Sequence, residues 1–305
     1  MKKQRENSAP LKSDEVSSKP SGCEFEPYES LTLKDNFIFT KVMSDPANCR
    51  GFLLRAFPDL DIGKVTAVQE STHQTAYGSK GVRFDVYASD GSKIFDLEMQ
   101  IVDKKDLPQR ARYYNCTIDS DQLEKGEDYP VLKKVYIIFI CTFPLPYGNL
   151  HKYTFRRYAL EDKDTALNDG TELIFYTTKG TADDLDSSMQ HFLDYIDSVP
   201  ASHIPDAYIT QLDESVRNAK MKPDWRRQYM DLKMWLQDQT FLLLQKRTEE
   251  VTAEVTEEVS KKVKAEEKAD VISRMLSNHY TDEQILVIAD ITQDELDQYK
   301  ASHKI

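Results

Sequence analysis

Residues 82–101 read VRFDVYASDGSKIFDLEMQI, and this stretch decides the fold. Apolar and polar side chains alternate on both sides of Asp90 and Gly91, a pair typical of a tight turn between antiparallel strands. The stretch therefore predicts a hairpin whose strands cover 82–89 and 93–101. Each strand then has an apolar face for the protein core and a polar face that bears carboxylates.

The spacing of the acidic residues predicts that they meet across this hairpin. A two-residue turn pairs Ser89 with Ser92, which places Asp85 opposite Asp96 and leaves Glu98 on the diagonal. Diagonal neighbours lie about 7–8 Å apart at the backbone, and their side-chain tips lie closer. Several carboxylates are therefore expected on one patch of the sheet.

Two interpretations of this carboxylate patch stay open from the residues alone. In the first, the patch is an exposed polar sheet face on which Arg83 offsets the charge of Glu98. In the second, it is a metal site, because like charges placed opposite each other destabilise a sheet unless a cation neutralises them. Carboxylate oxygens are hard ligands, which suit Mg²⁺ or Mn²⁺.

The chain on either side of the hairpin predicts an α/β fold with a mixed central sheet. Residues 135–141 form a continuous apolar run, typical of a strand buried on both faces. The order of helix, three strands, helix and buried strand is that of an α/β protein. The predicted helices here are 31–43, 48–57 and 107–123, and the predicted strands outside the hairpin are 64–71, 135–141, 152–158 and 172–177.

Asp85 on one strand and Glu98-x-Gln100 on the next resemble the core of the PD-(D/E)XK nucleases, which carry Asp and then Glu-x-Lys on an αβββαβ scaffold. Further short motifs are similar in order and spacing to those of the Rpn family of recombination-promoting nucleases, often labelled transposases. The likeness covers roughly residues 30–180. Besides the hairpin, its motifs are Lys34-Asp-Asn-Phe37, Arg110-x-Arg-Tyr-Tyr, Gly126-x-x-Tyr129 and Ile174-Phe-Tyr-x-x-Lys-Gly.

The resemblance implies a restriction-endonuclease-like core with its catalytic site on the hairpin. Asp85 and Glu98 would bind the metal ion, with the Met99 carbonyl as a third ligand. Gln100 stands where the general pattern has Lys, so it would position a water or a phosphate oxygen by hydrogen bonds without carrying charge. Asp35 would be the acidic residue of the first helix, and its alternative role is the N-cap of that helix.

Three more residues belong to the predicted site. Asp96 lies on the same face as the metal ligands, and we expect it to act behind them. Arg110 and Arg112 open the helix that follows the carboxylate strand, and guanidinium groups at a helix N-terminus can bind DNA phosphates. The alternative is that both arginines are surface residues without a role.

The function implied by the resemblance is metal-dependent endonucleolytic hydrolysis of DNA, with Mg²⁺ or Mn²⁺ as cofactor, in the service of recombination or DNA mobility. The alternative is a catalytically inactive DNA- or protein-binding module of the same fold. The intact set of Asp85, Glu98 and Gln100 favours the enzyme. A transposase with three acidic residues spread along a ribonuclease-H-like fold is not supported by the sequence.

The composition changes along the chain and predicts three segments. Residues 1–26 are polar and predicted to be disordered. Residues 27–220 are the nuclease-like domain, and 221–305 form a helical C-terminal region. Within that region, 223–268 is expected to form one long helix or two, and 268–299 two short helices.

A narrow apolar stripe marks the long helical segment. Val251, Val255, Val259 and Val263 follow one another at intervals of four residues among Lys and Glu. Such a stripe is too narrow for a helix that packs in a globular core. The segment is therefore either an exposed connector or a helix that pairs with its copy in a homodimer.

The chain has 305 residues with 40 Lys and Arg against 52 Asp and Glu, a formal net charge of −12. This composition excludes collagenous and wholly disordered proteins, and the acidic total argues against indiscriminate coating of nucleic acid. No apolar run reaches the roughly 18 residues of a membrane span, and the N-terminus lacks the apolar core of a signal peptide. We therefore expect a cytoplasmic protein whose four separated cysteines are free thiols.

Overall fold

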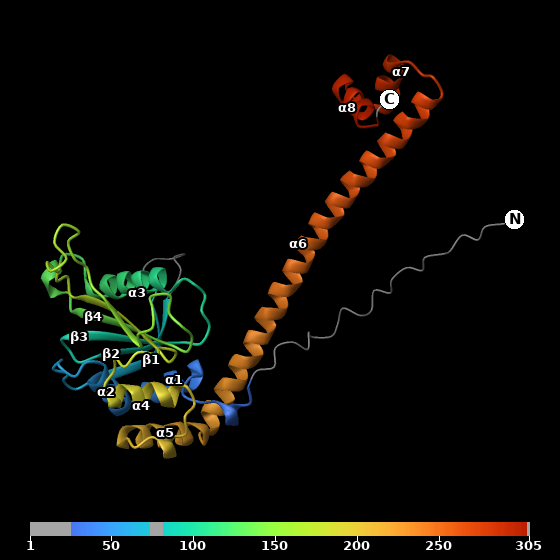
Figure 1. The fold of residues 1–305 in the computed structure, drawn as a ribbon. Helices are drawn as coiled ribbons and strands as arrows, with labels where there is room; N and C mark the ends of the chain where they lie inside the picture. Colours follow the sequence, from blue (N-terminus) through green and yellow to red (C-terminus); the bar gives the residue numbers. More distant parts are fainter. Residues whose placement is uncertain (1–25, 74–81, 304–305) are drawn as a thin grey trace. The chain divides into compact units, whose positions relative to one another are not determined.

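Six strands form one mixed sheet in the order β1-β2-β3-β4-β6-β5. The computed structural model describes residues 26–73 and 82–303, so nearly all of the segment predicted to be disordered lies outside the described residues (Figure 1). β3 is parallel to β4 and β4 to β6, whereas the other neighbours are antiparallel. The strands are β1 (Thr66–His73), β2 (Val82–Ser89), β3 (Lys93–Gln100), β4 (Lys134–Cys141), β5 (Lys152–Phe155) and β6 (Thr171–Thr177).

Helices cover both faces of the sheet, which confirms the predicted α/β fold (Figure 1). On one face, Phe95 and Leu97 of β3 join the core formed with α1, α2, α4 and α5. On the other face, Ile94 of β3 and Phe139 of β4 pack with Ala111 of α3. These helices are α1 (Asn36–Met43), α2 (Pro46–Ala56), α3 (Leu107–Gln122), α4 (Ser187–Ile196) and α5 (Ala207–Lys220).

β4 lies in the middle of the sheet and is buried on both faces, as its apolar sequence predicts. Every residue from Val135 to Cys141 is buried. Alternate side chains serve the two cores, because Tyr136 and Ile138 pack with the four-helix side and Ile137 and Phe139 with α3. A strand buried on both faces needs no polar alternation, as its sequence indicated.

The predicted hairpin forms, but its predicted register is wrong. Ser89 pairs with Ile94 rather than with Ser92, so Tyr87 instead of Asp85 lies opposite Asp96. The turn is longer than two residues because the Asp90 carboxylate folds over it. Its Oδ1 accepts hydrogen bonds from the backbone N–H groups of Ser92 (2.9 Å) and Lys93 (2.8 Å). A side chain that replaces backbone turn bonds in this way is the usual role of Asp in turns.

The strict alternation predicted for β2 also breaks near Asp85. Val82 and Phe84 pack on the α3 side, where the Phe84 ring lies 5.3 Å from that of Tyr114. Val86 and Ala88 pack on the opposite side. The apolar side chains of β2 change from one face of the sheet to the other at the point where β2 stops pairing with β3. The candidate active site lies at this point.

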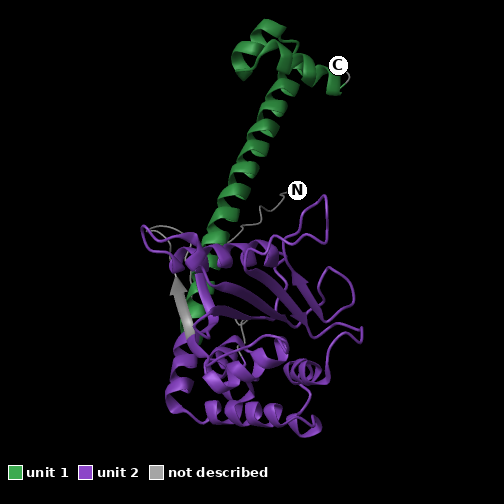
Figure 2. Ribbon diagram, turned by 90° about the vertical axis from the view of Figure 1, so that its left-hand side faces the viewer, with its two compact units in different colours: residues 1–24, 233–305 green, residues 25–232 purple. Residues whose placement is uncertain are grey.

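The C-terminal region is helical, as predicted, and its long segment is one helix. α6 (Pro223–Ser277) continues without a break through the valine stripe, and α7 (Asp282–Ala289) and α8 (Gln293–His303) follow. Thr281 begins α7 in a capping box with Gln284. The larger compact unit comprises residues 25–232, and the chain from Lys233 onward belongs to the smaller unit (Figure 2).

The smaller unit has an apolar cluster of its own. The end of α6 contributes Ile272 and Met275, α7 contributes Ile285 and Ala289, and α8 contributes Leu296. The valine stripe of α6 lies outside this cluster, and its side chains are exposed. Among the described residues, none of the helices combines the length and apolar character that a membrane crossing requires.

Candidate active site

The site begins where β2 and β3 part. Their pairing ends at Val86 and Leu97, although β3 continues to Gln100. The backbone N–H groups that face the gap beyond this point have no partner on the other strand, and a buried N–H group needs another acceptor. Carboxylates supply it: the N–H of Asp85 donates to Glu98 Oε1 (2.9 Å), and the N–H of Met99 donates to Asp85 Oδ2 (3.1 Å).

The result is a reciprocal clamp between Asp85 and Glu98. Each carboxylate accepts a hydrogen bond from the backbone of the opposite strand, so both side chains are fixed in the gap. Hydrogen bonds to a carboxylate are stronger than bonds between neutral groups. The two residues that the sequence singled out as metal ligands are therefore brought together.

The polar face of β3 is buried, and the interpretation as an exposed sheet face is wrong. The side chains of Asp85, Asp96, Glu98 and Gln100 all lie in the interior, with Asp96 0% and Glu98 2% exposed. Burial of a carboxylate is costly unless hydrogen bonds or opposite charges compensate for the lost water. The cluster therefore needs a compensating cation, and part of this requirement is met by α3.

The side chain of Arg110 on α3 contacts the buried polar cluster formed by Asp85, Asp96, Glu98 and Gln100. Its Nη1 donates to Gln100 Oε1 (3.0 Å), and its Nη2 donates to Glu98 Oε2 (3.3 Å). The guanidinium also lies over the rings of Tyr114 (5.5 Å) and Phe139 (5.4 Å). The sequence predicted a phosphate-binding role for this residue and missed its contact with the carboxylates, because the rotation of α3 against the sheet cannot be deduced from spacing.

Asp96 is the least compensated acid of the cluster. Its two carboxylate oxygens are buried and have no hydrogen-bond partner among the described residues. Burial raises the pKa of Asp96 well above its ordinary value, and the charge of Asp85 raises it further, whereas Glu98 and Arg110 act in the opposite direction. A bond between the Asp96 and Glu98 carboxyl groups forms only when one of them carries a proton.

Glu98 shows the same electrostatic conflict. Burial raises its pKa well above the ordinary value, and the charges of Asp85 and Asp96 raise it further. The Asp85 N–H and the Arg110 guanidinium partly offset this effect. Arg110 thus only partly compensates the charge of Asp96 and Glu98, and these two acids favour further positive charge nearby.

The backbone of Met99 adds an oxygen to the site. A residue in a strand directs its N–H and its C=O toward the same neighbouring strand. Since the Met99 N–H is bonded to Asp85, the Met99 carbonyl also faces β2, beyond the end of the pairing. This orientation agrees with the predicted use of the carbonyl as a ligand.

Asp35 and Arg112 lie apart from these contacts. Asp35 occupies the N-cap position of α1, yet its Oδ2 accepts from the N–H of Thr32 (2.6 Å) rather than from the helix. It is not among the charges that shift the pKa of Asp96 or Glu98. Arg112 is exposed on α3. Their catalytic and DNA-binding roles stay predictions.

The comparison with known families fits this geometry. Residues 36–182 match the model of the PD-(D/E)XK nuclease family transposases. This part of the chain belongs to that family. The matched range contains the hairpin, α3 and the whole sheet from β1 to β6, so membership confirms the nuclease-like fold and indicates a nuclease- or transposase-like function. A search of curated proteins finds no match to the chain.

The residues at the site fit a divalent cation of the kind that PD-(D/E)XK nucleases generally use. Within residues 26–73 and 82–303, no group of three or more His, Cys, Asp and Glu side chains is arranged to hold a metal ion. Mg²⁺, however, is commonly bound by one or two carboxylates together with water and substrate phosphate. Asp85, Glu98 and the Met99 carbonyl offer such a partial set, and the only partly compensated charge of Asp96 favours a cation nearby.

Replacing Asp96 by Asn should stabilise the metal-free protein at alkaline pH. A pKa that is raised in the folded state means that folding binds protons, so the free energy of unfolding falls as pH rises above the ordinary Asp pKa of about 4. Asp96→Asn removes the charge, and its amide can donate to a neighbouring carboxylate. We expect a gain of about 1–3 kcal/mol at pH 8, by urea denaturation in EDTA.

This gain should shrink as pH falls toward 4, where the wild-type carboxyl group is protonated. Asp164→Asn is the matched control, because Asp164 lies exposed in a loop. An Asp96→Asn variant less stable than wild type at pH 8 would show that the Asp96 charge is compensated.

Proposed function

We propose that the protein is a metal-dependent DNA endonuclease that hydrolyses phosphodiester bonds and promotes recombination or DNA mobility in the cytoplasm. The observation that carries the proposal is the clamp of Asp85 and Glu98 in the gap between β2 and β3, beside the Met99 carbonyl. Family membership of residues 36–182 supports the nuclease chemistry. The inactive binding module is the alternative that the experiments below separate.

Asp85, Glu98 and the Met99 carbonyl would hold Mg²⁺ or Mn²⁺. A bound cation of this kind lowers the pKa of its water and offsets negative charge on the phosphate as it is attacked. Gln100 cannot carry charge, so its task is to orient the water or a phosphate oxygen through its amide. The Asp35 carboxylate accepts hydrogen bonds from the N–H and the hydroxyl of Thr32. To assist catalysis, this side chain would have to leave these bonds and move toward the site.

Arg110 is proposed to exchange partners when DNA binds. In the structure its guanidinium compensates the charge of Glu98. A divalent cation on Glu98 would take over this compensation, and Arg110 would then be available to a phosphate oxygen a short distance away. Arg112, two residues further along α3 and exposed, would contact the DNA backbone directly.

Plasmid nicking tests the catalytic assignment. Asp85→Asn and Glu98→Gln keep the shape of each side chain and remove its charge, so wild type should cut with Mg²⁺ or Mn²⁺ while each variant loses about 100-fold or more in rate. Glu161→Gln, in an exposed loop, should cut like wild type. Equal cutting by wild type and both variants, or no cutting with either metal, would refute the assignment.

The salt dependence of DNA binding tests the role of Arg112. Each phosphate contact contributes about one counterion to the slope of log K against log salt concentration. Arg112→Ala should therefore lower this slope by about one, measured by fluorescence anisotropy. Arg217→Ala on α5 serves as the control, because Arg217 is similarly exposed and pairs with Asp213. An unchanged slope in Arg112→Ala would remove the residue from the DNA interface.

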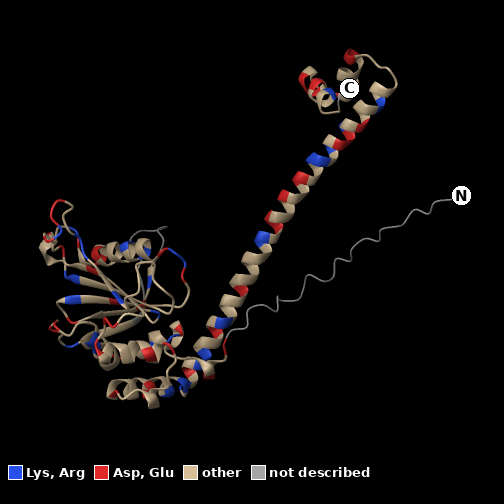
Figure 3. Cartoon of the chain, viewed as in Figure 1, with Lys and Arg blue, Asp and Glu red and all other residues tan. Residues whose placement is uncertain are grey.

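We also propose that α6 pairs with α6 of a second copy in an antiparallel homodimer. An antiparallel pair that places Val251 beside Val263 and Val255 beside Val259 buries the whole valine stripe. Positive and negative residues alternate in blocks along this part of α6 (Figure 3). The same register brings Glu250 beside Lys264 and Arg247 beside Glu267, two pairs of opposite charge, while Glu257 lies level with its own copy.

Sedimentation velocity of full-length protein tests this dimer. Val255→Asp combined with Val259→Asp puts charge into the stripe and should convert dimer to monomer. Thr252→Asp combined with Thr256→Asp adds the same charge beside the stripe and should leave the dimer intact. Monomeric wild type, or dimers in all three proteins, would leave α6 as a connector.

A further inference from the structure

A row of aromatic side chains leads from the candidate active site across the α3 face of the sheet to its edge. Residues directly opposite each other on neighbouring strands share a face. Glu98 of β3 is paired with Phe139 of β4, Phe139 with Phe175 of β6, and Phe175 with Tyr153 of the edge strand β5. The row therefore starts at a proposed metal ligand and ends at a sheet edge.

Ring contacts connect Arg110 to the sheet edge through Phe139 and Phe175. The Arg110 guanidinium lies 5.4 Å from the centre of the Phe139 ring, and Phe139 is stacked on Phe175 at 5.5 Å. Phe175 in turn meets Phe155 at 5.6 Å and Tyr147 at 6.2 Å. The arginine that contacts Glu98 is thus connected to the sheet edge through an unbroken series of rings.

Only the edge end of the row opens to solvent. Phe139 and Phe175 are buried, whereas Tyr147 is 39% and Phe155 38% exposed. Tyr147 lies 5.0 Å from Phe155 and 5.4 Å from Tyr153, and we call these three residues the aromatic patch. A cluster of half-exposed rings in mutual contact is more characteristic of a binding surface than of a core.

The aromatic patch is held in a fixed arrangement. The Tyr153 hydroxyl accepts a hydrogen bond from the N–H of Leu150 (3.0 Å), which ties the loop that carries Tyr147 to β5. Gly148 has φ +136°, and a Cβ there would lie 3.0 Å from the same hydroxyl. Because the rings are already ordered, a ligand that stacks on them pays little conformational entropy.

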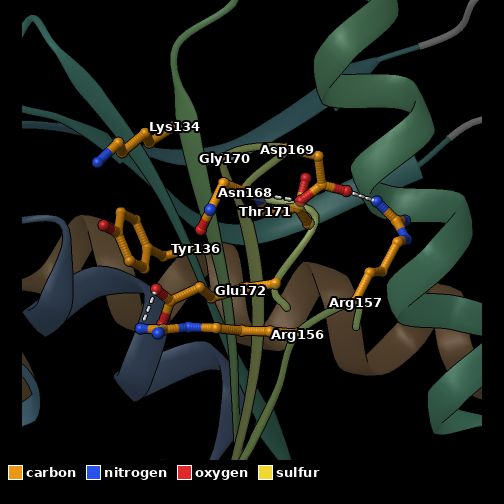
Figure 4. Close-up of a pocket in the computed structure, with 10 residues that line it drawn as sticks. Lys134, Tyr136, Arg156, Arg157, Asn168, Asp169, Gly170, Thr171 and Glu172 are labelled. Carbon is orange, nitrogen blue, oxygen red and sulfur yellow. Dashed lines mark hydrogen bonds and ion pairs between the residues drawn. The ribbon is translucent and has the colours of Figure 1, made fainter. Parts of the chain in front are cut away.

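An arginine follows the aromatic patch in the sequence and lies near α3. Arg157 follows Phe155 by two residues, and its charge lowers the pKa of Asp119 on α3 against the larger effect of burial. Figure 4 shows Arg157 and Arg156 turned to opposite sides, with Arg157 paired to Asp169 and Arg156 to Glu172. Aromatic rings beside an arginine match a chain of bases joined by phosphates.

We propose that the aromatic patch stacks unpaired bases of a DNA strand whose backbone reaches the candidate active site, so that the substrate contains a single-stranded segment. Ring faces of bases are accessible for stacking in an unpaired strand, whereas a duplex stacks them on one another. Strands lie about 4.8 Å apart, so the three steps from β3 to β5 cover about 14 Å. That length corresponds to about four nucleotides at a stacked rise of about 3.4 Å. The inference rests on the proposed function, whose site it extends.

Fluorescence anisotropy in EDTA, where metal-dependent hydrolysis cannot proceed, tests this surface with a labelled oligothymidine and a blunt duplex of equal length. Wild type should prefer the oligothymidine. Tyr147→Leu combined with Phe155→Leu keeps apolar volume and removes two rings, and should weaken oligothymidine binding about 10-fold or more, since stacking contributes about 1–3 kcal/mol per base. Duplex binding should not change.

Two controls keep the test decisive. Tyr129→Leu removes an exposed ring from the segment before β4 and should bind like wild type. Phe155→Tyr keeps the ring and should also bind like wild type, which separates loss of stacking from faulty folding. Equal affinity of wild type for both DNAs, equal weakening of both by the leucine variant, or full loss in Tyr129→Leu would overturn the inference.

The same data distinguish this inference from the proposed function. A protein that binds oligothymidine through the aromatic patch but cuts no DNA contradicts the nuclease proposal alone. A protein that cuts plasmid while binding duplex and oligothymidine equally contradicts the stacking inference alone.

Discussion

The site depends on one interaction, the exchange of hydrogen bonds between the Asp85 and Glu98 carboxylates and the backbone of the facing strands. Where β2 and β3 separate, two N–H groups would otherwise be buried without partners, which costs a protein more than a hydrogen bond normally contributes. The two carboxylates accept hydrogen bonds from these N–H groups, and these bonds hold the side chains in place. The gap in which the proposed metal ligands lie is therefore also the feature that orients them.

This arrangement creates an electrostatic conflict that the remaining structure only partly resolves. α3 buries the cluster and supplies Arg110, whose two bonds reach Glu98 and Gln100. Asp96 has no donor among the described residues, and burial raises its pKa. Arg110 therefore offsets only part of the negative charge of Asp96 and Glu98, a condition that suits a site for a cation and an anionic substrate. The acidic total of the chain, which argued against indiscriminate DNA coating, is compatible with a contact confined to this site.

The sequence predicts the positions of the strands more accurately than the register in which they pair. Alternation identified both hairpin strands, and the apolar run 135–141 identified the buried β4, because these signals follow from the periodicity of a strand. The register was wrong because the Asp90 side chain lengthens the turn, an effect that the Asp-Gly pair alone does not reveal. Asp85 and Glu98 were found from their motif, whereas the contact of Arg110 with Glu98 depends on how α3 rests on the sheet. The row from Phe139 to Tyr153 requires the strand order, which periodicity does not encode.

The proposed function depends on the binding of a divalent cation by the clamp of Asp85 and Glu98. The most direct measurement is isothermal titration of Mn²⁺ and of Mg²⁺ into chelator-treated, full-length protein without DNA. We expect saturable binding to wild type, a loss of affinity of about 10-fold or more in Asp85→Asn and in Glu98→Gln, and no change in Glu161→Gln. Identical binding isotherms for wild type and the two clamp variants would contradict it.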